Sequence, residues 1–98
     1  MISHDTRMAC VRQMMIELRA DGPIGIRRLK VALRDQVVGI DKVNVDEAFD
    51  LAWALMNHKT HPMVEEYEMF GERPPIEERT YVVASRMYDS QGNYKGSE

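Results

Sequence analysis

Apolar residues recur every three or four positions in the first part of the chain. Within residues 4–20 this spacing places a continuous apolar stripe on one side, which predicts an amphipathic helix. The stripe consists of Met8, Val11, Met14, Met15 and Leu18. Asp5 or Thr6 is suited to cap the start of this helix, and the Asp-Gly-Pro sequence at 21–23 is expected to end it.

Two later segments have the same helical spacing. The second helix is expected to begin at Gly25 and to stop by Gly39, with Ile24 in a short extended connector before it. The third helix has Asn44 as a good N-cap, with Glu47 three residues later in a capping-box-like arrangement. The predicted buried stripes are Ile26, Leu29, Ala32, Leu33 and Val37 in the second helix and Val45, Ala48, Phe49, Ala52, Leu55 and Met56 in the third.

The pattern changes after the third helix. Val64–Phe70 and Arg79–Tyr88 are rich in β-branched and aromatic residues and partly alternate between apolar and polar positions. Between them, Gly71–Glu78 contains a glycine and two prolines, which interrupt both helices and strands. These features predict a β-hairpin with a long, stiff tip, followed by a polar tail at residues 89–98.

This order of elements resembles the winged-helix family of helix-turn-helix domains. The resemblance covers about residues 5–88 and rests on the element order, on "GPIGIRRLKVAL" as connector and second helix, and on the hairpin as the wing. It implies an α+β fold with three helices followed by a two-stranded β-hairpin wing. Residues 1–88 would form a single domain and residues 89–98 a C-terminal tail. The alternative is a generic small α+β domain.

Composition narrows the class of protein further. The chain has 98 residues, of which 44% are hydrophobic and 30% charged, as in a single globular domain. Cys10 is the only cysteine, so no internal disulfide can form. No apolar run approaches the ~20 residues that span a bilayer. Because the first residues also lack the apolar centre of a secretory signal, we expect a cytoplasmic protein without a membrane partner.

Enzyme signatures are missing from the sequence. It contains no phosphate-binding glycine loop, nucleophile elbow or metalloprotease motif, so neither an enzyme nor a cofactor is expected. His58 and His61 are three positions apart and are interpreted as exposed polar residues at a helix end rather than as metal ligands. His4 lies at the N-terminus and does not complete a ligand set with them. Cys10 is expected to serve in packing or as an unreactive surface thiol. The eight methionines are expected to fill the core, with an adaptable partner surface as the alternative.

Basic residues cluster on the second helix. Arg27, Lys30 and Arg34 are three and four positions apart and should form one ridge, with Arg28 beside it. In helix-turn-helix proteins the helix before the recognition helix crosses the DNA backbone, so the resemblance implies that these residues contact phosphates. Arg73 in the hairpin tip would add a further contact. The alternative is an ordinary solvated charged face.

The third helix has the opposite charge. Residues 44–58 carry a net charge of −3, and residues 64–79 carry six glutamates against two arginines. Both elements that normally enter DNA grooves would therefore be repelled by the flanking phosphates. The alternative site is a protein-binding ridge on the third helix, where an aromatic anchor lies beside carboxylates. This ridge consists of Asp46, Glu47, Asp50, Trp53 and Asn57.

Two functions follow from these surfaces. The resemblance favours a transcriptional regulator that binds double-stranded DNA, and it also implies a homodimer, since winged-helix regulators often dimerise. The charge distribution favours an acidic interaction module that binds a basic protein surface and inhibits a larger or nucleic-acid-binding host complex. Small acidic proteins of this kind are frequent in phages. The resemblance tips the expectation toward the regulator.

Overall fold

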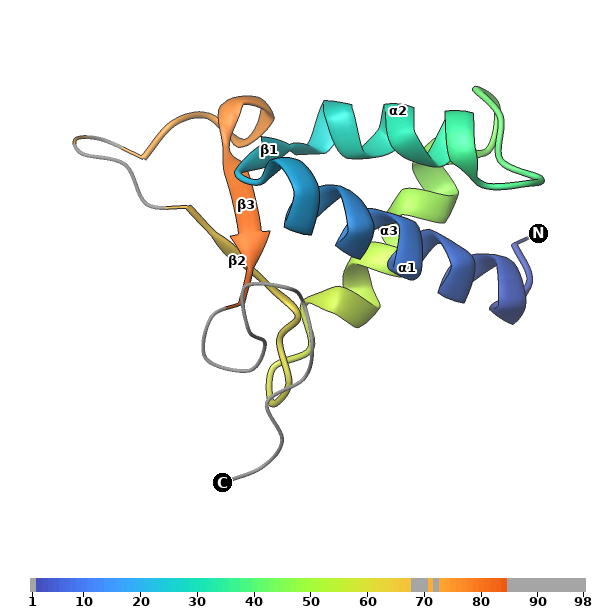
Figure 1. The fold of residues 1–98 in the computed structure, drawn as a ribbon, viewed down its shortest axis with the longest axis horizontal. Helices are drawn as coiled ribbons and strands as arrows, with labels where there is room; N and C mark the ends of the chain where they lie inside the picture. Colours follow the sequence, from blue (N-terminus) through green and yellow to red (C-terminus); the bar gives the residue numbers. More distant parts are fainter. Residues whose placement is uncertain (1, 68–70, 72, 85–98) are drawn as a thin grey trace.

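The computed structural model describes residues 2–67, 71 and 73–84. Its elements, in chain order, are α1 (His4–Asp21), β1 (Ile24–Gly25), α2 (Ile26–Gln36), α3 (Val45–Met56), β2 (Val64–Glu66), the 3-10 turn η1 (Ile76–Glu78) and β3 (Thr80–Val83). The three helices pack against one another, and the small sheet lies at one end of them (Figure 1). The predicted α+β class and the three helices are confirmed.

The sheet has three strands, so the prediction of a two-stranded hairpin alone was wrong. Ile24 pairs with Tyr81 and Gly25 with Thr80, both antiparallel, which makes the strand order β1-β3-β2. The expected extended connector is therefore an edge strand, because its backbone groups pair with β3 while the Ile24 side chain enters the core. Predicted strand residues 68–70 and 85–88, and the predicted tail at 89–98, lie outside the described residues.

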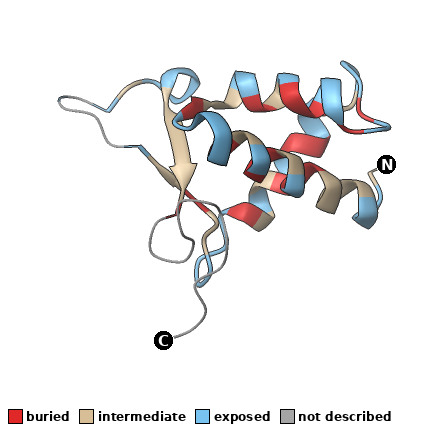
Figure 2. Ribbon diagram, viewed as in Figure 1, coloured by how far each residue is buried: buried red, intermediate tan, exposed pale blue. Residues whose placement is uncertain are grey.

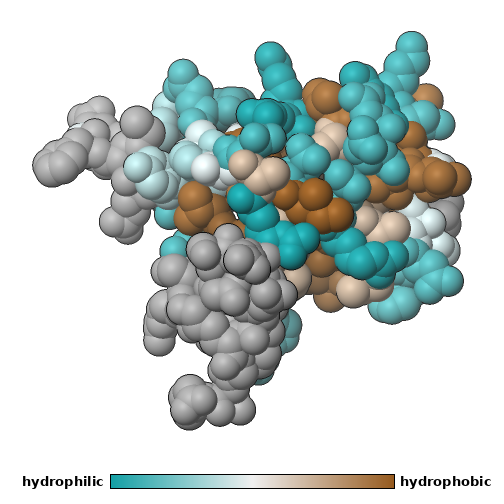
Figure 3. All heavy atoms as spheres, viewed as in Figure 1, coloured by the Kyte–Doolittle hydropathy of each residue, from teal (hydrophilic) through white to brown (hydrophobic). Residues whose placement is uncertain are grey.

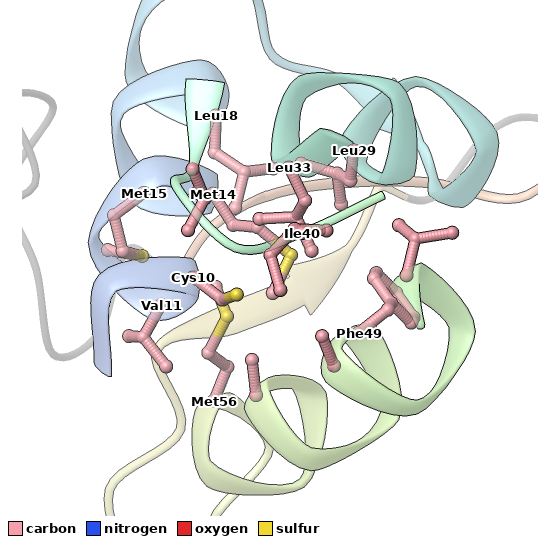
Figure 4. Close-up of a cluster of buried hydrophobic side chains, with 14 of the residues drawn as sticks. Cys10, Val11, Met14, Met15, Leu18, Leu29, Leu33, Ile40, Phe49 and Met56 are labelled. Carbon is pink, nitrogen blue, oxygen red and sulfur yellow. The ribbon is translucent and has the colours of Figure 1, made fainter. Parts of the chain in front are cut away.

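One hydrophobic core joins the helices and the sheet. Buried positions follow the inner faces of α1, α2 and α3 (Figure 2), and side chains from all three helices point into a common cluster (Figure 4). The predicted stripes are buried except for Met8, Ile26 and Leu55, which are half-buried at the edges. Arg7 of α1 adds a polar link, since its Nε donates to the Leu51 carbonyl of α3 at 2.7 Å.

The ends of α1 depend on two short-range contacts. Ser3, rather than Asp5 or Thr6, caps its start, because the Ser3 hydroxyl accepts from the Thr6 N–H at 3.1 Å. At the other end the Gly22 N–H donates to the Leu18 carbonyl at 3.0 Å. A Cβ at Gly22 would lie 2.5 Å from that carbonyl oxygen, so the close approach requires glycine. The chain can then turn directly into β1.

A reciprocal capping box precedes α3, three residues earlier than the predicted one. Asp41 Oδ1 accepts from the Val43 and Asn44 amides at 2.8 and 3.1 Å, and Asn44 Oδ1 accepts from the Asp41 amide at 2.9 Å. The Val45 amide donates to the Asp41 carbonyl at 3.0 Å, so a hydrogen-bonded turn leads directly into α3. Asn44 is the N-cap residue of α3, as predicted, but its side chain bonds back to Asp41 and Gly39 instead of capping the helix. Among the described residues no capping bond involves Glu47.

Replacing Asp41 with alanine should lower the free energy of unfolding by about 1 kcal/mol, as for other side-chain caps. Glu47→Ala is the matched control, since it removes a first-turn carboxylate that caps nothing, and it should cost clearly less. Urea denaturation of both variants measures the difference. A larger loss for Glu47→Ala would place the box at Asn44 and Glu47 after all.

Phe49 is 3% exposed at the centre of the α3 stripe. Phe49→Ala should destabilise the domain by about 3–5 kcal/mol, because a large cavity opens among helices that relax only in part. Val43→Ala is the control: Val43 is 85% exposed, so its truncation should change stability by less than about 0.5 kcal/mol. Thermal melts that show the two variants equally stable would contradict this assignment of the core.

Candidate functional site

The predicted basic ridge forms on α2. Arg27, Lys30 and Arg34 all border a groove of about 720 Å³ that runs along this helix. Arg28 lies apart from the groove, and its Nη2 is 2.8 Å from Asp21 Oδ2 at the end of α1. The structure thus brings together the three residues that were predicted to share a ridge. Arg28, the fourth basic residue of α2, instead forms an ion pair with Asp21 of α1.

Lys30 is held between α2 and α3. Its Nζ lies 2.9 Å from Asp46 Oδ1 and 5.3 Å from the centre of the Phe49 ring. A carboxylate and an aromatic face therefore both attract the ammonium group, and the side chain is only 32% exposed. A phosphate approaching Lys30 would meet a nearly neutral pair instead of an isolated cation.

Arg73 lies in the hairpin and is also paired. Its Nε donates to both oxygens of Glu66, at 3.2 and 3.1 Å, and its Nη2 donates to Oε1 at 2.6 Å. These hydrogen bonds lower the pKa of the Glu66 carboxyl below its ordinary value, so the pair stays charged at neutral pH. Arg73 borders a different hollow from the α2 ridge, so the structure does not unite these predicted contacts.

Two predicted phosphate contacts remain without an acidic partner. Arg27 and Arg34 are exposed on α2, and neither makes an ion pair within the part of the chain that the structure describes. They are seven positions apart, which is about 10.5 Å along a helix. Of the five basic residues expected to bind nucleic acid, three are thus paired with carboxylates of the same chain.

The carboxylates of α3 are less fully paired. Asp46, Glu47 and Asp50 are all exposed at the start of the helix, as predicted. Asp46 is bound to Lys30, whereas Glu47 and Asp50 make no ion pair among the described residues. The outward face of α3 therefore keeps a negative charge after its internal contacts are counted.

Trp53 is part of the fold as well as of this face. Its ring stacks on Phe49 with centroids 5.1 Å apart and meets Tyr81 of β3 edge-on at 4.9 Å. The half-buried indole thus links α3 to the sheet. Asn57 ends the helix, because its Nδ2 donates to the Trp53 carbonyl at 2.9 Å. A partner would find only the outer part of Trp53 available.

The groove beside α2 was not predicted. Its deeper part contains half-buried Ile26 and buried Val45, and more exposed Val31 and Ile76 border it. Ile76 belongs to η1, which the hairpin carries to the start of α2 (Figure 1). The only sequence signal was Val31, an apolar residue between Arg27 and Arg34 outside the predicted buried stripe. Hydrophobic patches also appear between hydrophilic ones on the face shown in Figure 3.

Comparisons with known proteins place this chain in no family. No family model, no curated protein and no solved structure matches it. The features that bear on its function are the basic ridge of α2, the acidic face of α3 and the groove beside α2.

The described residues offer little reactive chemistry. Among them, no three histidine, cysteine, aspartate or glutamate side chains are grouped as metal ligands would be. His58 and His61 stack with ring centroids 6.2 Å apart, and the His58 Nδ1 lies 2.9 Å from the Thr60 hydroxyl. No helix in the described part of the chain combines the length and apolarity needed to cross a membrane.

Cys10 lies inside the core, which decides between its two predicted roles in favour of packing. It is fully buried, and its side chain and that of Met56 point toward each other (Figure 4). Removal from water raises the pKa of the thiol, so even less thiolate forms than in an exposed cysteine.

Folded protein should therefore react with a thiol reagent such as dithionitrobenzoate far more slowly than unfolded protein does. Both burial and the raised pKa reduce the reactive thiolate. Absorbance recorded at pH 8 with and without urea tests this. Equal rates in the two samples would show that Cys10 is accessible in the native state.

Proposed function

We propose that this chain is a winged-helix-like interaction module that binds a basic protein surface through the outward face of α3. The element order and the pairing of β1 with β3 are compatible with a winged-helix layout. The distribution of ion pairs in the structure supports this proposal most directly. Three of the five candidate DNA-binding cations are paired with carboxylates of the chain, whereas Glu47 and Asp50 on α3 are paired with no cation among the described residues.

Electrostatics make this face a poor match for DNA. A helix in the major groove lies between two rows of phosphates, which would repel Glu47 and Asp50. Of the five candidate DNA-binding cations, only Arg27 and Arg34 make no ion pair among the described residues. Two phosphate contacts correspond to a salt slope of about −1.8. Dedicated DNA-binding proteins make roughly 6–10 such contacts.

A basic protein surface would attract the carboxylates of α3 that DNA phosphates repel. Lysines and arginines of the partner would meet Glu47 and Asp50, which increases the association rate and favours the correct orientation. The exposed part of Trp53 offers an aromatic contact within the same face. Nucleic-acid-binding proteins carry basic surfaces of this kind, so this module would compete with their nucleic acid and inhibit them.

A regulator that binds double-stranded DNA is the second candidate. Arg27 and Arg34 favour it, since both are exposed on the helix that would cross the DNA backbone in helix-turn-helix docking. Its dimeric form, implied by the family resemblance, would double the number of such contacts to four. This reading requires the acidic face of α3 to stay outside the groove.

Charge reversal on α3 separates the two functions. The partner is first isolated from the native host with and without nuclease treatment, and its affinity is then measured by calorimetry. Glu47→Lys with Asp50→Lys should weaken binding of a basic protein about tenfold or more, since like charges would face each other. The same change should strengthen binding to duplex DNA at ~50 mM salt, where electrostatic attraction is strong.

Asp5→Lys with Asp35→Lys is the matched control. It changes the net charge by the same amount at exposed positions that are not on α3. Equal effects of the two double variants would mean that only net charge matters, which contradicts a specific site on α3. Recovery of duplex DNA alone, bound more tightly after reversal on α3, would favour the regulator.

A further inference from the structure

The groove beside α2 is a second surface. It includes Val45 at the start of α3 but none of the outward carboxylates of that helix. One wall is α2 itself, and the opposite wall is the turn η1. Val31 is 40% exposed and Ile76 is 56% exposed, so each wall presents an aliphatic side chain to solvent. The groove of about 720 Å³ therefore has an exposed aliphatic side chain on each side, against which side chains of another protein can pack.

Charge is arranged in order along the α2 wall. Arg27, Val31 and Arg34 are separated by four and three positions and therefore follow one another on the same side of the helix. The sequence of side chains along this wall is thus cation, aliphatic group, cation. Both arginines lack an ion-pair partner among the described residues, so their charges are available to a ligand.

The η1 wall carries the opposite charge. Glu77 and Glu78 follow Ile76 directly, and both border the groove. A ligand that was negative all round, such as a nucleic acid backbone, would be attracted by one wall and repelled by the other. Favourable contact with both walls requires a ligand that is acidic on one side and basic on the other.

We propose that this groove binds an amphipathic helix of a partner protein. Its carboxylates would lie toward Arg27 and Arg34, and an aliphatic side chain would lie between them against Val31. A helix supplies this pattern when acidic, aliphatic and acidic residues are three or four positions apart, because such residues share one face. Lysine or arginine on the neighbouring face would then lie toward Glu77 and Glu78.

Helical spacing matches the site better than an irregular ligand would. The two arginines are about 10.5 Å apart along α2, and residues seven positions apart on a docked helix have the same separation. One docked helix can therefore meet both cations without bending. This inference does not depend on the proposed function, since the groove and the outward face of α3 use different unpaired charges.

A designed peptide provides the test. A fluorescein-labelled helix of about 16 residues, long enough to form in isolation, carries glutamate, leucine and glutamate at spacings of four and three, with lysine on the adjacent face. Fluorescence anisotropy should show micromolar binding to the full chain. A second peptide with lysines in place of the two glutamates should bind at least about tenfold more weakly, because it places cations against Arg27 and Arg34.

Variants of the chain locate the binding. Arg27→Ala with Arg34→Ala should abolish the discrimination between the two peptides, and Val31→Ser should weaken the binding of both. Arg12→Ala with Lys59→Ala is the control that removes two exposed cations elsewhere, and it should leave both affinities unchanged. Circular dichroism confirms that each variant is folded. Glu47→Lys with Asp50→Lys should keep peptide binding, which distinguishes this groove from the α3 face.

Several results would overturn the proposal. Equal affinity for both peptides, or no binding at millimolar concentration, would show that the walls do not select an acidic helix. Displacement of the peptide by duplex DNA as effectively as by unlabelled peptide would identify a general polyanion surface. A wild-type dimer that becomes monomeric in Arg27→Ala with Arg34→Ala would mean that a second copy of the chain occupies the groove.

Discussion

The buried face of α3 is the contact on which the other parts of the molecule depend. Phe49 packs in the core, its ring is stacked by Trp53, and Trp53 in turn meets Tyr81 of the sheet. The ammonium group of Lys30 lies over the same Phe49 ring. Helix α3 therefore sets how closely α2 packs against it, and it also sets the position of β3. Both candidate surfaces take their shape from that arrangement.

Three of the five candidate DNA-binding cations are paired with carboxylates of the same chain. Arg28 pairs with Asp21, Lys30 with Asp46 and Arg73 with Glu66, and each pair joins two different elements or two parts of the hairpin. Ion pairs near the surface contribute little to stability, because water and salt screen them. Their larger effect is on recognition, because they leave cations on one side of α2 and carboxylates on the outward side of α3.

Local sequence patterns predicted the helices and their buried faces well. Spacing of three and four residues is a direct consequence of helical geometry, so positions such as Leu33 and Phe49 were assigned correctly. The reciprocal capping bonds join Asp41 and Asn44 instead of the predicted Asn44 and Glu47. Both pairs have the same spacing in the sequence, so only the geometry of the loop decides which pair forms the bonds. Strand β1 was missed because two residues are too few to show alternation.

The candidate site was less predictable than the fold. That Arg27, Lys30 and Arg34 share a ridge followed from their spacing, but the pairing of Lys30 with Asp46 joins two helices and has no local signal. The groove is also lined by η1, which lies near α2 because β3, the next element in the chain, pairs with β1. Surfaces built from residues far apart in the sequence require the three-dimensional arrangement, whereas a helix face does not.

Pairing between β1 and β3 has a consequence for how the molecule folds. The three helices contact one another within residues 4–56, whereas Ile24 pairs with Tyr81, 57 positions further along the chain. Closing so long a loop has an entropic cost that few new contacts offset until the helices are already packed. The edge strand is therefore expected to join last and to open first. The hairpin, and the groove wall that it carries, would exchange its amide protons before the helical core does.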